Sequence, residues 1–150
     1  MSTLVSLVTV PVATGTVTKL TNVDTVNVGT GDMFDFTSAT FTDGGNQAVV
    51  LGLAAYTTVT IATTATETTA TLFYAAIEAA VTGTANSVYL IKFVDGGADT
   101  TADGTFDGTY LVVNDNTAAI AAGDAVIKLV GVTTGSTVAV AGEVATLTIA

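Results

Sequence analysis

Short apolar runs alternating with Ser and Thr recur along this chain, and β-branched residues dominate them. This pattern is typical of half-buried strands. In the first half it predicts strands around Val5 and Val26, followed by two strands at 48–56 and 57–64. In the second half it predicts strands at 87–95, 108–115, 124–132, 136–140 and 143–150. The first two of these look like partners, because each carries Tyr-Leu followed by aliphatic residues and ends in Asp.

One segment, 69–81, breaks the strand pattern. Leu72, Ala76, Ala80 and neighbouring aliphatic residues recur about every four positions, which places them on one stripe of a helix. Gly83 follows as a natural stop. No linker or change of composition divides the chain. We therefore expect one mainly β domain over 1–150, a β-sandwich or jelly-roll-like fold with one short α-helix at about 69–81.

The amino-acid composition excludes several kinds of chemistry. The chain has no Cys, His or Trp, and carries 13 Asp and Glu against 3 Lys and Arg, for a formal net charge of -10. Disulfides, imidazole and thiol catalysis, and the usual zinc sites are therefore excluded. An acidic chain without a basic patch is also a poor partner for nucleic acid or anionic membranes. Without His to activate a Ser or Thr nucleophile, we expect no enzymatic activity.

The sequence also lacks the usual patterns of a signal peptide and of a membrane-spanning segment. The apolar N-terminal run has no Lys or Arg ahead of it, so a cleaved signal peptide is not expected. Thr and Ser interrupt the apolar residues throughout, and no stretch of about 18 purely apolar residues occurs, so membrane insertion is not expected either.

The segment between the two matched strands is rich in Asp and Gly. Asp95, Asp99, Asp103 and Asp107 recur at intervals of four, each near a Gly. Calcium takes six to eight oxygen ligands from carboxylates and backbone carbonyls, and four close carboxylates repel one another unless a cation joins them. The spacing differs from that of an EF-hand. The segment is thus either a calcium site or a solvated, charged hairpin loop.

Two smaller groups of acidic residues are candidate calcium sites by the same reasoning. Asp32 and Asp35 lie at a Gly-rich turn, for which a plain turn is the simpler interpretation. The run Asn114-Asp115-Asn116 and Asp124 flank a short segment between two predicted strands. This turn could gather the carboxylates of Asp115 and Asp124, or it could be a plain turn.

The second half of the chain carries a resemblance. The Ala-rich segment 69–81, SVYLIKFVDGG at 87–97 and GTYLVVNDNTAAIAAGDAVIKLVGVT at 108–133 together resemble the C-terminal region of type I-secreted bacterial surface proteins of the RTX class, including its S-layer proteins. The resemblance covers 69–150. It implies calcium-stabilised β structure, secretion without a cleaved N-terminal signal, and assembly at the cell surface. It would also make Asp95, Asp99, Asp103, Asp107, Asp115 and Asp124 calcium ligands. The tandem G-G-x-G-x-D repeats of the family are absent, and only VGTGD at 28–32 is similar to them.

Both ends of the sequence, 2–10 and 143–150, are apolar strand patterns. Such strands can add to the sheet of a neighbouring copy, or they can pair within their own sandwich. Addition of this kind does not close, so it builds filaments, tubes or layers. We therefore expect an extracellular, non-enzymatic, calcium-stabilised subunit that polymerises with copies of itself. The alternatives are a C-terminal secretion and attachment domain, and a module that binds a cell-surface glycan.

Overall fold

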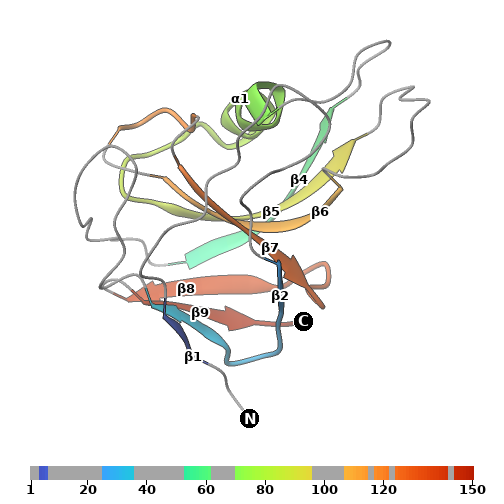
Figure 1. The fold of residues 1–150 in the computed structure, drawn as a ribbon, viewed down its shortest axis with the longest axis vertical. Helices are drawn as coiled ribbons and strands as arrows, with labels where there is room; N and C mark the ends of the chain where they lie inside the picture. Colours follow the sequence, from blue (N-terminus) through green and yellow to red (C-terminus); the bar gives the residue numbers. More distant parts are fainter. Residues whose placement is uncertain are drawn as a thin grey trace.

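The computed structural model describes residues 4–6, 25–35, 53–61, 70–95, 107–114, 117–121, 124–141 and 144–150. These residues form nine strands and one helix (Figure 1). The fold is a mainly β sandwich with one short helix, as the sequence predicts. The elements are β1 (Leu4–Ser6), β2 (Thr25–Asn27), β3 (Met33–Asp35), β4 (Leu53–Ile61), α1 (Ala70–Val81), β5 (Val88–Asp95), β6 (Gly108–Val113), β7 (Ala125–Val130), β8 (Thr137–Ala141) and β9 (Val144–Thr148).

The strands are hydrogen-bonded in the order β1-β3-β9-β8-β4-β5-β6-β7-β2. β4 divides this order into two sheets, because its residues 53–55 pair with β8 and its residues 56–61 pair with β5. In Figure 1 the sheet of β8, β9 and β1 lies below the sheet of β5, β6 and β7, and α1 lies above both. The molecule is therefore layered as sheet, sheet and helix.

The prediction of two strands at 48–56 and 57–64 is wrong for the described part of that region. A single strand, β4, runs through the expected boundary between Tyr56 and Thr57. No Gly, Pro, Asn or Asp interrupts its sequence, LAAYTTVTI, so nothing forces a turn there. Strands that pass from one sheet to the other form the corners of such sandwiches.

Helix α1 belongs to a crossover between parallel strands. β4 and β5 pair in parallel, which requires a connection long enough to return the chain to the same end of the sheet, and α1 lies in that connection. Two further pairs, β1 with β3 and β2 with β7, are also parallel. The sandwich is thus mixed, in contrast to the all-antiparallel jelly roll. The predicted partnership of 87–95 with 108–115 is confirmed by the antiparallel β5–β6 pair.

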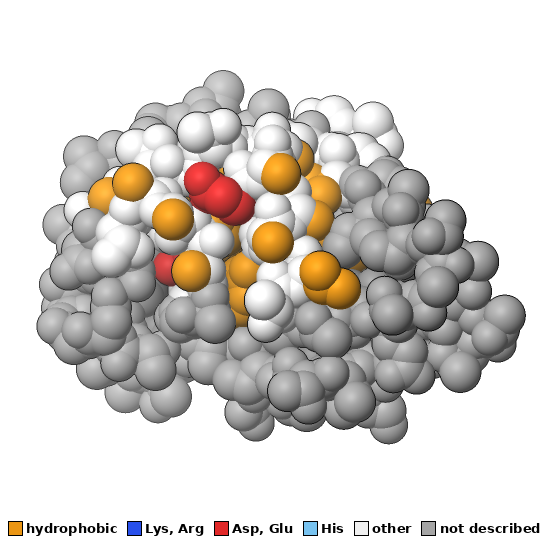
Figure 2. All heavy atoms as spheres, turned by 90° about the horizontal axis from the view of Figure 1, so that it is seen from above, with side chains coloured by type: hydrophobic (Ala, Val, Ile, Leu, Met, Phe, Trp, Pro, Cys, Tyr) orange, Lys and Arg blue, Asp and Glu red, His pale blue; other side chains and the backbone are white. Residues whose placement is uncertain are grey.

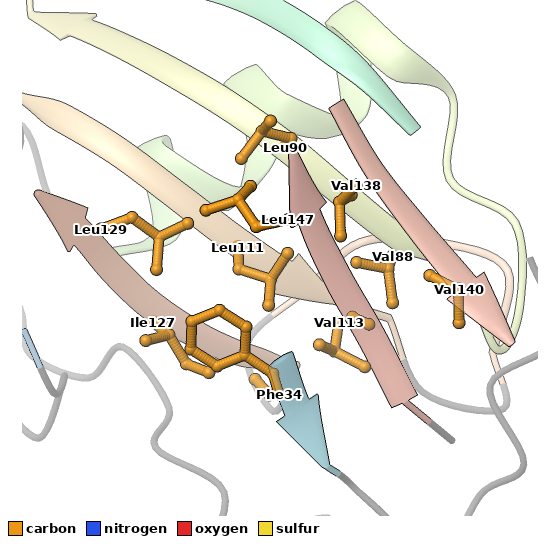
Figure 3. Packing of buried hydrophobic residues seen from close by; sticks show 12 residues of the cluster. Phe34, Val88, Leu90, Leu111, Val113, Ile127, Leu129, Val138, Val140 and Leu147 are labelled. Atoms are coloured by element: carbon orange, nitrogen blue, oxygen red, sulfur yellow. The ribbon is translucent and has the colours of Figure 1, made fainter. Parts of the chain in front are cut away.

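Two hydrophobic cores lie on opposite faces of the β5–β6–β7 sheet. Between the sheets, side chains of β3, β8 and β9 meet those of β5, β6 and β7 (Figure 3); they include Phe34, Leu147, Leu90, Leu111 and Ile127. On the other face α1 covers the sheet, and its residues Phe73, Tyr74 and Ile77 pack among residues of β4 to β7. A sheet buried on both faces needs nearly continuous apolar strands, and this accounts for the high mean hydropathy of +0.67.

The turn between β2 and β3 joins the two sheets on the side opposite β4. The N–H of Val28 donates to the carbonyl of Val130 at the end of β7, and the N–H of Gly31 donates to the carbonyl of Leu147 in β9. β9 itself pairs with β3 on one side and β8 on the other. The end strand therefore pairs within its own sandwich.

No helix within the described residues is long and apolar enough to cross a membrane.

Candidate cation site

The connection between β6 and β7 begins at Asn114 and ends at Asp124. Both residues lie one step beyond the last paired residues of these strands, Val113 and Ala125. Side chains alternate along a strand, so Asn114 and Asp124 share the face of Val112 and Val126, which α1 covers. The structure thus brings two buried oxygen-bearing side chains to the head of one loop.

Asn114 is completely buried, and its side-chain amide is held in one orientation. Its Nδ2 donates to the carbonyl oxygen of Thr84 at 2.9 Å and to that of Ala118 at 3.0 Å. A flipped amide would press Oδ1 against these two oxygens, so the orientation follows from the bonds. Oδ1 is buried and has no hydrogen-bond partner. Such an acceptor is rare, because leaving it unpaired is unfavourable by about 1–3 kcal/mol.

Asp124 is 1% exposed. Its Oδ2 accepts a hydrogen bond of 2.7 Å from the N–H of Ala121, three residues earlier. Its backbone carbonyl accepts a bond of 2.9 Å from the hydroxyl of Tyr74 on α1. Lys128 is the nearest cationic residue along β7, about 13 Å away at the rise of a strand.

Glu78 ties the same loop to the end of α1. Its Oε2 accepts hydrogen bonds from the N–H of Ile120 at 2.8 Å and of Gly83 at 2.9 Å. A carboxylate at the C-terminal end of a helix faces the negative end of the helix dipole, which is unfavourable unless donors or cations compensate. Here two backbone donors do so, and Glu78 holds the loop in place.

Several oxygen atoms therefore lie around the side-chain amide of Asn114. They are its own Oδ1 and, on the Nδ2 side, the carbonyl oxygens of Thr84 and Ala118, while Asp124 brings a carboxylate to the other end of the same connection. Oxygen ligands suit hard cations such as calcium, whereas a transition metal would favour nitrogen or sulfur. The described residues contain no group of three His, Cys, Asp or Glu that could hold a metal ion.

The long acidic segment lies at the β5–β6 hairpin. Asp107 and Asp95 fall one and two positions beyond the Phe93–Gly108 pair, so the structure brings both ends of the segment to the base of one loop. Asp107 is exposed, whereas Asp99 and Asp103 lie outside the described residues.

Asp107 also acts on its neighbours in β6 and β7. Burial and the charge of Asp107 raise the pKa of Tyr110, while burial lowers the pKa of Lys128, an effect that Asp107 opposes and Lys92 reinforces. The Nζ of Lys128 lies 5.8 Å from the centre of the Tyr110 ring. The base of this hairpin therefore holds cations as well as acids.

The remaining predicted residues do not form a described cluster. Asp32 is buried and closes its own turn, because its Oδ2 accepts a 2.8 Å bond from the N–H of Gly29. Asp35 lies three residues further on, beyond buried Phe34, and alternation along β3 puts it on the face opposite Phe34. Asp115 lies outside the described residues. Sequence reasoning named Asp124 as a candidate ligand and Asn114 only as part of the turn, and it missed Glu78.

Comparisons with family models, with curated proteins and with solved structures found no match to this chain.

Proposed function

We propose that this chain is a non-enzymatic, extracellular structural subunit, stabilised by calcium, that assembles with copies of itself into a surface layer, filament or tube. The observation that carries the proposal is the outward face of α1. Figure 2 looks onto this side of the molecule and shows hydrophobic side chains dispersed there among uncharged polar and backbone atoms, with acidic side chains between them.

The outward residues of α1 are small or apolar. Thr71, Leu72, Ala75, Ala79 and Ala80 are exposed, and Leu72 is 37% exposed. A helix on the surface of a globular protein ordinarily presents charged side chains on its outer face. In α1 the one charged residue is Glu78, which is half-buried and bonded to backbone donors.

The net charge of the chain favours a second copy of the chain as the partner of the outward face of α1. A chain of net charge -10 repels other copies wherever acidic surfaces meet. The outward face of α1 carries one carboxylate, that of Glu78, which two backbone N–H groups bind, so it repels another copy less than the rest of the surface does. Alanines four residues apart, such as Ala75 and Ala79, allow two helices to approach closely. A 12-residue helix is about 18 Å long, so one such contact is small and needs a second contact in the assembly to be stable.

The second contact is proposed at the edge of the lower sheet. β1 ends the described strand order and pairs with β3 alone among the described strands, so its other side is open to strand addition within that set. β9, in contrast, lies between two strands and is a poor candidate. Two different contact surfaces give head-to-tail growth.

The alternatives have less support. A glycan-binding module needs an exposed aromatic platform, whereas the aromatic residues whose burial the structure describes are buried, apart from half-buried Tyr89: Phe34, Phe73, Tyr74, Phe93 and Tyr110. A C-terminal secretion and attachment domain, as the RTX resemblance implies, remains the second proposal.

The test is the state of assembly of charge variants. We expect Ala75→Glu to reduce the assembled fraction severalfold in negative-stain microscopy and light scattering at equal calcium. Ala75→Gln has the same length without the charge and should assemble better than Ala75→Glu. Thr134→Glu adds the same charge at an exposed turn away from α1 and should assemble normally. A wild-type protein that stays monomeric with and without calcium would overturn the proposal.

A further inference from the structure

We propose that residues 83–84 and 118–120 form a latch at the C-terminal end of α1, two segments that open and close as one unit while the strands stay paired. When closed, the latch holds the outward face of α1 in the position in which a second copy binds it. This second part rests on the self-association proposed above, whereas the latch itself is tested on the single chain.

The carboxylate of Glu78 is the first group that binds both segments. Its Oε2 accepts hydrogen bonds from the N–H of Gly83 at 2.9 Å and from that of Ile120 at 2.8 Å. The segments also pack against each other, because a Cβ on Gly83 would lie 2.9 Å from the Cγ1 of Ile120 and against the carbonyl oxygen of Ala118. Neither segment can therefore move away from the other without losing a bond to Glu78.

The side-chain amide of Asn114 binds the same two segments at a second point. Its Nδ2 donates to the carbonyl oxygen of Thr84 at 2.9 Å and to that of Ala118 at 3.0 Å. Asn114 is completely buried, so a carbonyl that leaves takes a partner from a group that water reaches poorly. Two side chains that each hold both segments make separate opening of either segment unfavourable.

The residue that leads into the latch has a strained backbone. Thr82, directly after α1, has a φ of 53°, a left-handed conformation that is unfavourable for a β-branched residue. Opening of the latch releases this strain. Phe73 and Ile77, in contrast, are fully buried and hold the preceding turns of α1 against the sheet. The C-terminal end of α1 is therefore easier to open than the part that precedes it.

The latch also positions part of the outward face of α1. Ala79 and Ala80 are exposed and follow directly on Glu78 in the last turn of the helix. If Glu78 releases Gly83 and Ile120, this turn loses its fixed place. A second copy that binds the outward face therefore favours the closed latch, and assembly should protect it from opening.

The experiment measures native-state hydrogen exchange of the whole monomeric chain by NMR. In the wild type, the amides of Gly83 and Ile120 should have the same protection within about threefold, below that of the β5–β6 pair. Asn114→Ala should lower both by about tenfold or more, although Asn114 accepts a bond from neither amide. Val138→Ala is the control, because Val138 lies in the core between the sheets. It should lower protection in the β5–β6 pair and leave Gly83 and Ile120 unchanged.

Glu78→Gln provides the reciprocal measurement, and it decides the question if Asn114→Ala does not fold. It should speed exchange of the side-chain amide of Asn114, whose acceptors are Thr84 and Ala118, by about threefold or more. An Asn114 amide that exchanges at the wild-type rate in this variant would show that the two bridges act separately.

The remaining outcomes are equally distinct. Unequal protection of Gly83 and Ile120, or no loss at either in Asn114→Ala, would overturn the latch. An equal loss at these amides and in the β5–β6 pair of Val138→Ala would also overturn it, because both amides would then exchange only through global unfolding.

Assembly is measured separately, at higher concentration. Asn114→Ala should assemble severalfold less than Val138→Ala, which destabilises the fold from the other core and leaves the latch intact. Equal assembly of the two variants would overturn the link between the latch and the outward face of α1. If the wild-type chain does not assemble, the proposed function fails, while the exchange measurements still decide whether the latch exists.

Discussion

Glu78, in the last turn of α1, accepts a hydrogen bond from the N–H of Ile120, which lies 42 residues further along the chain. The same carboxylate oxygen accepts the N–H of Gly83. One side chain thereby fastens the helix, the segment that follows it and the β6–β7 connection to one another.

We therefore expect Glu78→Ala to lower the free energy of unfolding by about 2–3 kcal/mol, because two backbone donors lose a charged acceptor. Glu78→Gln keeps an acceptor of the same length and should lower it by about 1 kcal/mol. Urea unfolding followed by circular dichroism measures both. Equal midpoints for the Ala variant and the wild type would show that the two bonds contribute nothing.

Gly83 is closely surrounded. A Cβ at this position would meet the carbonyl oxygen of Ala118, the Oε2 of Glu78 at 2.6 Å and the Cγ1 of Ile120 at 2.9 Å. We expect Gly83→Ala to destabilise the fold by about 2 kcal/mol or more, since backbone as well as side chains would have to shift. Gly29→Ala is the control, because a Cβ there meets nothing within 4 Å. Similar melting temperatures for the two variants would contradict this packing.

Adjacent residues of α1 differ sharply in their surroundings. The ring of Phe73 lies 4.7 Å from that of Phe93 and 5.1 Å from that of Tyr110, measured between centroids, and Phe73 is fully buried. Phe73→Ala should therefore cost about 3–5 kcal/mol. Leu72→Ala removes a side chain that is 37% exposed and should cost less than about 1 kcal/mol. Chemical denaturation of the two variants tests which face of the helix is buried. A larger loss of unfolding free energy for Leu72→Ala than for Phe73→Ala would contradict the orientation described.

Stability should fall at alkaline pH because of Tyr110. Burial, and then the negative charge of Asp107, raise the pKa of Tyr110 above its ordinary value of 10.0. The unfolded chain therefore releases this proton near pH 10 while the folded chain retains it, and the unfolded state becomes more stable relative to the folded state as the pH rises further. The contribution is fully present below pH 10 and declines above it by up to about 1.4 kcal/mol per pH unit.

The variants Tyr110→Phe and Lys128→Met separate the groups involved. Tyr110→Phe should flatten the alkaline decline in urea unfolding. Burial lowers the pKa of Lys128 from 10.5, so this residue adds stability as the pH rises toward 10.5, opposite to Tyr110. Lys128→Met should thus steepen the alkaline decline. An unchanged pH profile for Tyr110→Phe would contradict the assigned role.

The sequence predicts the second half of the fold well. The helix expected at 69–81 is α1, and the partners expected at 87–95 and 108–115 are β5 and β6. The four-residue repeat predicts the helix but not its buried face, because Leu72 and Ala80 are exposed whereas Phe73 and Ile77 are buried. The two strands carry matched apolar runs around Tyr89 and Tyr110. Local sequence periodicity is therefore enough to predict an element whose surroundings stay the same along its whole length.

Pairing across the sheets was not predictable in the same way. The passage of β4 between sheets and its parallel pairing with β5 depend on contacts that local alternation does not encode. The candidate cation site shows the same limit. Asp124 stands out in the sequence as an acid at a turn, but Asn114 becomes notable only because its amide is fixed by the carbonyl of Thr84, 30 residues earlier, and by that of nearby Ala118. Likewise, nothing near Glu78 in sequence indicates its bond to Ile120.

The position of β9 between β3 and β8 bears on the order of folding. β3 precedes it by about a hundred residues, so the lower sheet forms only after a long segment has been closed into a loop. During synthesis from the N-terminus, β3 cannot pair with its antiparallel partner β9 until nearly every other strand has emerged. The β5–β6–β7 meander can pair earlier from neighbouring segments, so we expect it to be the nucleus onto which the remaining sheet condenses late.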